Sequence, residues 1–128
     1  MLTLKKLLYV FLFSFGLNVF WEQAHSFLYA NYQGTPITEF ILLRAAVSDA
    51  VILSLLALPF LYFDFFRKRV WLIILLGIAV SMLIELYALH TGRWTYNEYM
   101  PLIPFLHIGL TPTVQLGLLG YLVYLFVL

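Results

Sequence analysis

Four stretches of the chain are apolar enough and long enough to form membrane-spanning helices. A bilayer core of about 30 Å requires about 20 apolar residues at a rise of about 1.5 Å per residue. The pattern predicts spans at about residues 4–24, 40–63, 70–89 and 112–128. The connection between the third and fourth spans is also apolar. We therefore expect an all-α integral membrane protein, one transmembrane domain over residues 1–128, in which this connection is an interfacial or re-entrant loop.

Polar residues inside the spans recur at helical spacing. The first span carries Ser14, Asn18, Glu22 and His25 on one helix face. The other spans carry Arg44, Asp49, Gly77, Ser81, Glu85 and, near the start of the fourth, Gln115. Converted into depth along each helix, the ionisable positions Glu22, His25, Arg44, Asp49 and Glu85 fall in the outer half of the bilayer. Because burying polar groups in hydrocarbon costs free energy, we expect these residues to form one polar layer with a functional role.

The composition supports a hydrocarbon environment. Of the 128 residues, 64% are hydrophobic and 10% are charged, whereas a typical soluble domain has about 25% charged residues. A net charge of +1 leaves no basic face for nucleic acid. The sequence has no cysteine, which excludes disulfides, thiolate metal sites and cysteine nucleophiles.

The ends of the spans predict the topology. Lys5 and Lys6 precede the first span, and Arg67–Arg69 joins the second span to the third. The positive-inside rule therefore predicts that both termini lie in the cytoplasm. We expect the membrane to be the plasma membrane. No clean small-x-small cleavage site follows the first apolar run, so we expect a retained helix rather than a signal peptide. Thr35-Pro36 and Thr111-Pro112 are typical helix starts.

The ionisable residues of the polar layer admit two interpretations. Arg44 could pair with Asp49, Glu85 or Glu22, and such a network could serve only to hold the helices together. Three carboxyl groups exceed what one arginine needs, which favours a functional cavity. Because buried like charges disfavour full ionisation, we expect one of the three carboxyl groups to stay protonated.

Metal and haem chemistry have incomplete patterns. Glu22-x-x-His25 has the spacing used in helix-bundle di-iron sites, which need a second copy that this chain lacks. His90 could join Asp49 and Glu85 around a single metal, or face His25 across a haem. The sequence shows no nucleophile elbow and no phosphate-binding loop. We therefore predict neither a metal nor another cofactor.

Acid–base chemistry on a lipophilic molecule fits the pattern better. Carboxyl groups in a low-dielectric site differ in proton affinity, so one can donate a proton while another accepts one. Aromatic faces can stabilise a carbocation. Trp94, Tyr96 and Tyr99 also suit the interfacial aromatic belt, and the proline-containing stretch Met100–Leu106 is either a membrane anchor or a lid over the cavity.

Residues 85–115 resemble a known family. Glu85, then Gly92-Arg93-Trp94-Thr95-Tyr96, then Gly109-Leu110-Thr111-Pro112 are similar to the lycopene cyclase domain of small membrane carotenoid-biosynthesis proteins. The resemblance implies an isomerase or cyclase in carotenoid biosynthesis. It also implies that Glu85, Trp94 and Tyr96, which match the family motif, are functional residues. The family has paired glutamates after its proline, whereas this chain has Thr113-Val114-Gln115. A neutral Gln115 is no general acid, which leaves a related isomerase, a hydratase or a companion subunit.

The leading hypothesis is a membrane-embedded acid–base isomerase or lyase that binds an isoprenoid-like lipid without a cofactor. Glu85 is expected to donate a proton and Asp49 to accept one, while Glu22 and His25 complete the catalytic group. The expected substrate-binding residues are Arg44, Trp94, Tyr96, Asn18 and Gln115.

Two alternatives stay open. The first is a dimeric proton-coupled transporter or channel, in which Gly117 and Gly120 provide a close helix contact. The second is a non-catalytic membrane subunit. The expected partners are the lipid bilayer, a lipophilic small molecule, and either a second copy of the chain or a membrane partner subunit, with no nucleic acid.

Overall fold

Four long helices dominate the computed structural model, which describes residues 2–128. They are α1 (Leu2–His25), α2 (Glu39–Tyr62), α4 (Leu72–His90) and α5 (Leu110–Val127). The short elements are η1 (Ser26–Leu28), β1 (Tyr29–Tyr32), α3 (Asp64–Arg67) and β2 (Trp94–Tyr96). By length and composition, all four long helices can cross a membrane. The expected helical membrane fold is confirmed, and the protein is a small membrane protein.

The helix starts follow local chemistry. At the start of α2, the Thr38 hydroxyl accepts a hydrogen bond from the backbone N–H of Ile41 at 3.3 Å. The expected start at Thr35-Pro36 is therefore wrong by one turn, because Thr38 has the extended backbone of an N-cap and places Glu39 in the first turn. Pro112 lies in the first turn of α5, as expected.

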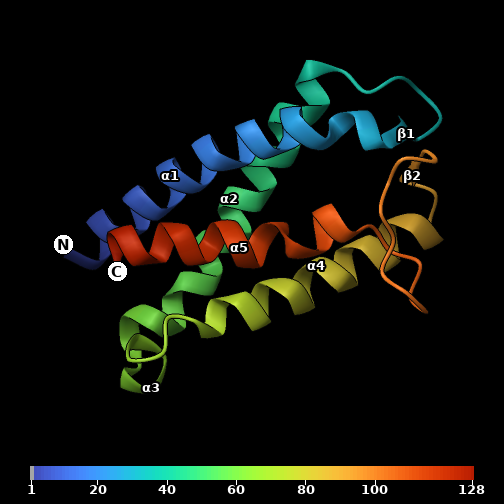
Figure 1. Ribbon diagram of the computed structural model, residues 1–128. Coiled ribbons are helices and arrows are strands. Elements are labelled where there is room, and N and C mark those ends of the chain that lie inside the picture. Colours follow the sequence, from blue (N-terminus) through green and yellow to red (C-terminus); the bar gives the residue numbers. More distant parts are fainter. Residues whose placement is uncertain (1) are drawn as a thin grey trace.

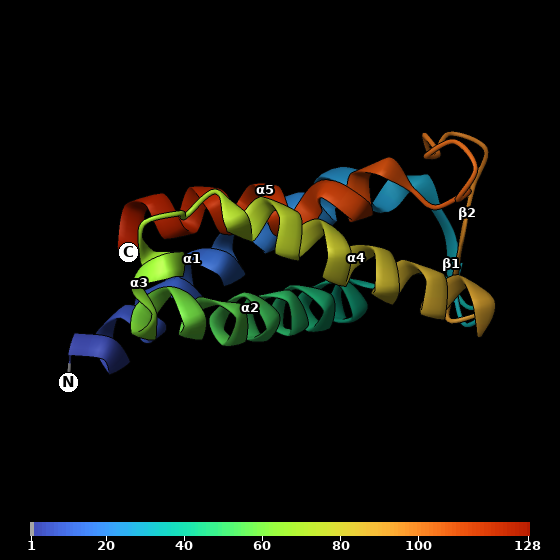
Figure 2. The ribbon, with the colours of Figure 1, turned by 90° about the horizontal axis from the view of Figure 1, so that it is seen from below.

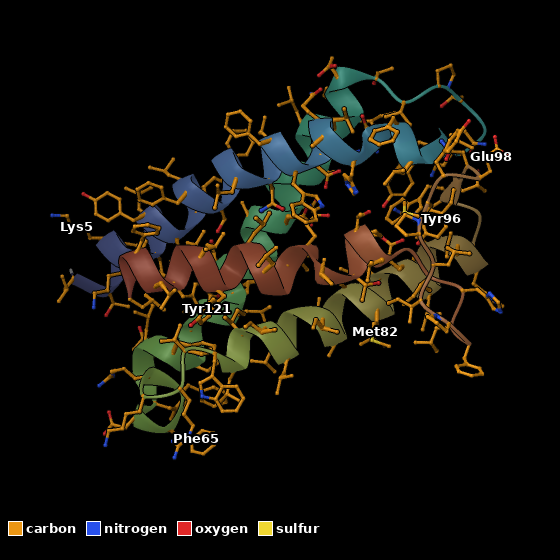
Figure 3. The ribbon with its side chains drawn as sticks, in the orientation of Figure 1. Lys5, Phe65, Met82, Tyr96, Glu98 and Tyr121 are labelled. Atoms are coloured by element: carbon orange, nitrogen blue, oxygen red, sulfur yellow. The ribbon has the colours of Figure 1, made fainter. Side chains whose placement is uncertain are left out.

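The helices form a bundle with two distinct ends. Both termini and α3 lie at one end, while β1 and β2 lie at the other (Figure 1). Lys5 and the segment around Phe65 share the first end (Figure 3), so the two basic clusters are on the same side, as predicted. Helix α1 packs against α2 and α5, and α5 packs against α4. Helices α2 and α4 meet at α3 and then diverge towards the strands (Figure 1). Helices α2 and α5 lie on opposite sides of the bundle (Figure 2).

Helix α1 turns its polar face inward. Its buried residues are Val10, Ser14, Asn18, Glu22 and His25, which include the whole polar stripe that the sequence predicts. Large apolar side chains such as Leu4 and Phe20 are exposed on the outer surface. This inverted arrangement is the one that a lipid environment favours, because polar groups find partners only inside the bundle.

Helices α4 and α5 touch backbone to backbone. A Cβ atom added to Gly77 would lie 2.4 Å from the backbone N of Gly117, and one added to Gly117 would lie 2.6 Å from the backbone O of Ile74. A Cβ on Gly120 would meet the side chains of Leu53 and Ile73. Gly117 and Gly120 are therefore occupied within the chain. The expected role of these glycines in a dimer contact is wrong.

A two-stranded antiparallel sheet joins the two loops at the strand end. Tyr29 is paired with Tyr96 and Tyr32 with Trp94. The sequence pattern predicted only an apolar loop here, because runs of three and four residues are too short to show a period-two pattern. Pairing orients Trp94 and Tyr96 so that both side chains are half-buried, while Tyr99 is exposed. Trp94 and Tyr96 therefore face the interior of this end of the bundle, and Tyr99 does not.

The proline-containing loop folds onto the start of α5. Met100 and Ile108 are buried, and Leu102 forms an isolated bridge with Gly109. Phe105 is 96% exposed at the tip and has a φ of +71°. The exposed aromatic tip suits an anchor in the membrane interface.

The end of the bundle nearer the termini has an apolar core. Leu53, Phe60, Ile73, Val123 and Tyr124 pack there with almost no exposed surface. The Tyr124 hydroxyl donates a hydrogen bond to the backbone O of Leu53, which satisfies the main polar atom in this region. Polar side chains are thereby concentrated in the opposite half of the bundle.

Candidate functional site

A cavity of about 610 Å³ lies between the diverging parts of α2 and α4. This volume lies within the range of about 300–1,000 Å³ that is usual for small-molecule sites. The cavity lining contains Glu22, Asp49, Ser81, Glu85, Trp94 and Gln115 among its polar groups, and Ile41, Ile52, Ile84 and Leu116 among its apolar ones. Arg44, Tyr29, Tyr32 and Arg93 also contribute to the wall. Four helices and the sheet therefore meet at one site, as the polar layer predicted.

The Gln115 amide is the centre of the buried network. Its Nε2 atom lies 2.8 Å from Oδ1 of Asn18, 2.9 Å from Oε1 of Glu22 and 2.9 Å from Oδ2 of Asp49. An amide nitrogen carries only two protons, so it cannot donate fully to all three oxygens. Two carboxyl groups held against one amide repel each other when both are ionised, and a shared proton relieves this repulsion.

Both oxygens of Glu22 have partners. Oε1 faces Gln115, and Oε2 lies 3.2 Å from Nε2 of His25. The other ring nitrogen of His25 lies 3.1 Å from the hydroxyl oxygen of Thr111. The ring of Tyr29 meets His25 edge to face with centroids 5.4 Å apart. His25 is therefore fixed by three neighbours and orients Glu22.

Glu85 is held by the two aromatic residues of β2. The Trp94 indole donates to Oε2 of Glu85 at 3.0 Å, and the Tyr96 hydroxyl donates to the same oxygen. The Tyr96 oxygen in turn accepts the backbone N–H of Gly109 at 2.9 Å. The residues quoted for the Glu85…Trp94-x-Tyr96…Gly109 pattern thus form one hydrogen-bonded group.

Burial and the Glu85 carboxyl act together on the outer tyrosines. Burial first, and then the hydrogen bond to Glu85, raise the pKa of Tyr96 above its usual value. Burial and the nearby negative charge of Glu85 also raise the pKa of Tyr29. Both phenols therefore stay neutral and act as hydrogen-bond donors or as aromatic surface.

One oxygen on each of two cavity-lining carboxyl groups receives no hydrogen bond from a protein N–H or O–H group, although the Asp49 carboxyl also contacts Glu22. Within the described chain, hydrogen bonds reach Oδ2 of Asp49 and Oε2 of Glu85, but none reaches Oδ1 of Asp49 or Oε1 of Glu85. Asp49 comes from α2 and Glu85 from α4, on opposite sides of the cavity. A molecule in the cavity can therefore contact a carboxyl oxygen on each side.

Arg44 does not pair with these carboxyl groups. Its Nη2 donates to the Tyr32 hydroxyl at 2.7 Å, and its guanidinium lies 5.3 Å from the centroid of the Tyr32 ring. Over residues 2–128, the ion pairs within 4 Å are His25–Glu22 and Arg67–Asp64. The alternative in which Arg44 pairs with one of these carboxyl groups is therefore wrong. Tyr32 lies in a strand that the sequence pattern did not predict. Its hydrogen bond with Arg44 holds the guanidinium at the rim of the cavity.

Three predicted site residues support the site without lining the cavity. Asn18 donates to the backbone O of Ser14 at 2.7 Å and presents its oxygen to Gln115. His25 and Tyr96 contact Glu22 and Glu85 from outside the cavity wall. The described residues between Thr95 and Thr111 also do not line the cavity, so the proline-containing loop does not cover it as a lid.

The expected metal alternatives do not form a cluster. His90 is exposed at the end of α4, whereas His25 is buried against Glu22 and Thr111. Over residues 2–128, no three His, Asp or Glu side chains come together as a metal site would require.

The site also contains residues that sequence reasoning did not assign. Tyr29 and Thr111 hold His25, and Tyr32 holds Arg44. The Thr111-Pro112 sequence indicated a helix start. It could not indicate the contact between Thr111 and His25 of α1, because that contact depends on how α1 and α5 pack.

Comparisons of the chain with protein-family models, with curated proteins and with solved structures found no match.

Proposed function

We propose that the protein carries out cofactor-free acid–base chemistry on a lipophilic, isoprenoid-like molecule in the cavity between α2 and α4. The observation that carries this proposal is the pair of carboxyl oxygens, Oδ1 of Asp49 and Oε1 of Glu85, that receive no hydrogen bond from a protein N–H or O–H group in the wall of a 610 Å³ cavity. Opposed acid and base groups in a low-dielectric site are the minimal equipment for moving a proton across a double bond.

The hydrogen bonds favour one assignment of roles. Oε2 of Glu85 accepts from both Trp94 and Tyr96, and hydrogen bonds of this kind stabilise the carboxylate form. Glu22 is held by both Gln115 and His25, whereas Asp49 is held by Gln115, so the proposal assigns the proton shared by the two carboxyl groups to Asp49. Asp49 is therefore the donor and Glu85 the acceptor in this proposal, the reverse of the order that the sequence suggested.

The aromatic wall suits a cationic intermediate. Tyr29, Tyr32 and Trp94 line the cavity, and the rings of Tyr32 and Trp94 stack with centroids 6.3 Å apart. Protonation of a double bond produces a carbocation, which the electron-rich faces of aromatic rings stabilise. The divergence of α2 and α4 provides a lateral route by which a long apolar chain enters from the bilayer.

The apolar core argues against the channel alternative for a single chain. Leu53, Phe60, Ile73 and Val123 fill the half of the bundle nearer the termini. Protons and ions need polar groups or water along the whole path, and the described side chains provide them in one half only. A polar site confined to one end of the bundle is the arrangement expected of an enzyme or a binding protein.

The proposal includes the cellular setting. Lys5, Lys6 and Arg67–Arg69 favour a cytoplasmic location for both termini, in the plasma membrane. The cavity then opens in the outer leaflet. Together with the resemblance of residues 85–115 to the lycopene cyclase domain, this setting suggests a role in carotenoid biosynthesis as an isomerase, a cyclase or a hydratase.

The test uses the full chain in lipid nanodiscs with the acyclic polyene lycopene as the probe, in D₂O. Asp49→Asn and Glu85→Gln should each reduce deuterium transfer into the probe by about 10²-fold or more, the usual contribution of a general acid or base. Glu98→Gln is the matched control, since Glu98 is exposed at the same end of the bundle. Unchanged deuterium transfer in both site variants refutes the proposal. Proton flux into liposomes that depends on Glu85 would support a transporter instead.

A further inference from the structure

The hydroxyl of Ser81 is buried in the wall of the cavity without a hydrogen-bond partner. Ser81 is only 3% exposed and lines the cavity from α4. Its Oγ atom is one of three buried side-chain polar atoms that have no partner over the described residues. The other two belong to Ser14 and Trp21, which do not line the cavity.

Apart from Ser14, which does not line the cavity, the other serines and threonines inside the long helices include several that avoid this situation. Ser48, Ser54 and Thr113 each donate to the backbone oxygen four residues earlier, at 3.0, 2.7 and 2.6 Å respectively. This is the usual solution for serine and threonine in apolar helices. Ser81 forgoes it. A buried polar group without a partner costs about 1–3 kcal/mol, so its orientation needs a compensating ligand.

Ser81 and Glu85 form a pair on one helix face. They are four residues apart, so their Cβ atoms are neighbours at about 5–6 Å. The Glu85 Oε1 atom also lacks a partner and belongs to the same cavity. Two oxygens across one helical turn are suitably spaced for one small hydroxylic molecule to bridge them.

We propose that Ser81 and Glu85 together bind the water molecule that attacks the substrate, which makes the reaction a hydration of a carbon–carbon double bond. The inference rests on the proposed acid–base function and chooses the hydratase among its reaction types. A cyclase or isomerase site has no need of a polar group at this position, because its carbocation loses a proton or is captured by another double bond.

The reaction balances with water as the second reactant. The proton on Oδ1 of Asp49 forms a C–H bond with one carbon, using the π electrons of the double bond. The oxygen of the water forms a C–O bond with the cationic carbon, and the proton that it loses passes to Oε1 of Glu85. Proton exchange with water at the cavity mouth returns Glu85 to the carboxylate and Asp49 to the acid.

The experiment follows oxygen and hydrogen isotopes separately. The full chain in nanodiscs is incubated with lycopene, either in H₂¹⁸O or in D₂O. The expected product of the unaltered chain is an alcohol that contains ¹⁸O. Ser81→Ala should reduce ¹⁸O incorporation about tenfold or more, the equivalent of one lost hydrogen bond to a reacting group. Deuterium transfer to carbon should persist, because Asp49 is untouched.

Ser54→Ala is the matched control, because Ser54 donates within α2 and does not line the cavity. This variant should incorporate ¹⁸O at the rate of the unaltered chain. Folding is followed by SDS titration: Ser81→Ala should be at least as stable as the unaltered chain, since it removes an unsatisfied buried group.

Each contrary result has a distinct meaning. Deuterated, cyclised or isomerised product without ¹⁸O overturns hydration and leaves the acid–base function standing. Normal ¹⁸O incorporation by Ser81→Ala overturns the role of Ser81. An absence of both isotopes from the probe overturns the acid–base function together with this inference.

Discussion

Replacing Gly77 with alanine tests the backbone contact that sets the angle between α4 and α5. The new Cβ would lie 2.4 Å from the N and 2.5 Å from the Cα of Gly117. Ordinary contacts between such atoms are about 3.5 Å, so the helices must separate by about 1 Å. The obstacle is backbone, which cannot rotate away as a flexible side chain would.

The expected cost follows from two opposing effects. Overpacking of a close contact costs about 1–3 kcal/mol, and a backbone clash belongs at the upper end. Alanine in a helix gains back up to about 1 kcal/mol relative to glycine. Gly77→Ala should therefore lower the free energy of unfolding by about 2 kcal/mol. Because Glu85 lies on the same face two turns further along α4, its distance from Gln115 should increase as well.

The assay is SDS unfolding of the full chain in detergent, followed by circular dichroism. Gly16→Ala in α1 is the control, since a Cβ there would meet nothing within 4 Å, and its stability should be unchanged or slightly higher. If Gly77→Ala unfolds at the same SDS fraction as Gly16→Ala, the close α4–α5 contact does not exist and the reasoning fails.

Three further predictions concern the polar network. Gln115→Leu removes the amide between the carboxyl groups and should lower the free energy of unfolding by about 2–3 kcal/mol in the same SDS assay, whereas a loss under about 0.5 kcal/mol would show that the amide has no such role. Tyr96→Phe leaves the Gly109 N–H without its acceptor and should increase amide hydrogen exchange there, which mass spectrometry can measure; unchanged protection would contradict the contact. Because the pKa values of Tyr29 and Tyr96 are raised in the folded chain, the unfolded chain ionises first as the pH rises, so the contribution of these tyrosines to stability should be constant below about pH 10 and fall above it. The double variant Tyr29→Phe, Tyr96→Phe should lose part of that fall, and an unaltered profile would count against the buried phenols.

Helix number, helix length and the inward polar face were determined by the sequence alone. The four spans follow from the length of apolar runs against the thickness of a bilayer, which is a local property of the chain. The stripe Ser14, Asn18, Glu22, His25 became the buried face of α1 because helical periodicity decides which residues share a face. That Glu22, Asp49, Glu85 and Gln115 meet in one layer also followed from depth along each helix.

Tertiary structure decided the partners within that layer. Arg44 contacts Tyr32 instead of a carboxyl group, and Trp94 and Tyr96 turn inward to Glu85, because a short sheet forms between two loops that are 62 residues or more apart. Gly117 packs against α4 of its own chain because α5 is the central helix of the bundle. The unpartnered Ser81 hydroxyl is likewise visible only once the cavity is formed. Periodicity gives the direction of a side chain from its own helix axis, whereas its partner depends on the packing of segments that are distant in the chain.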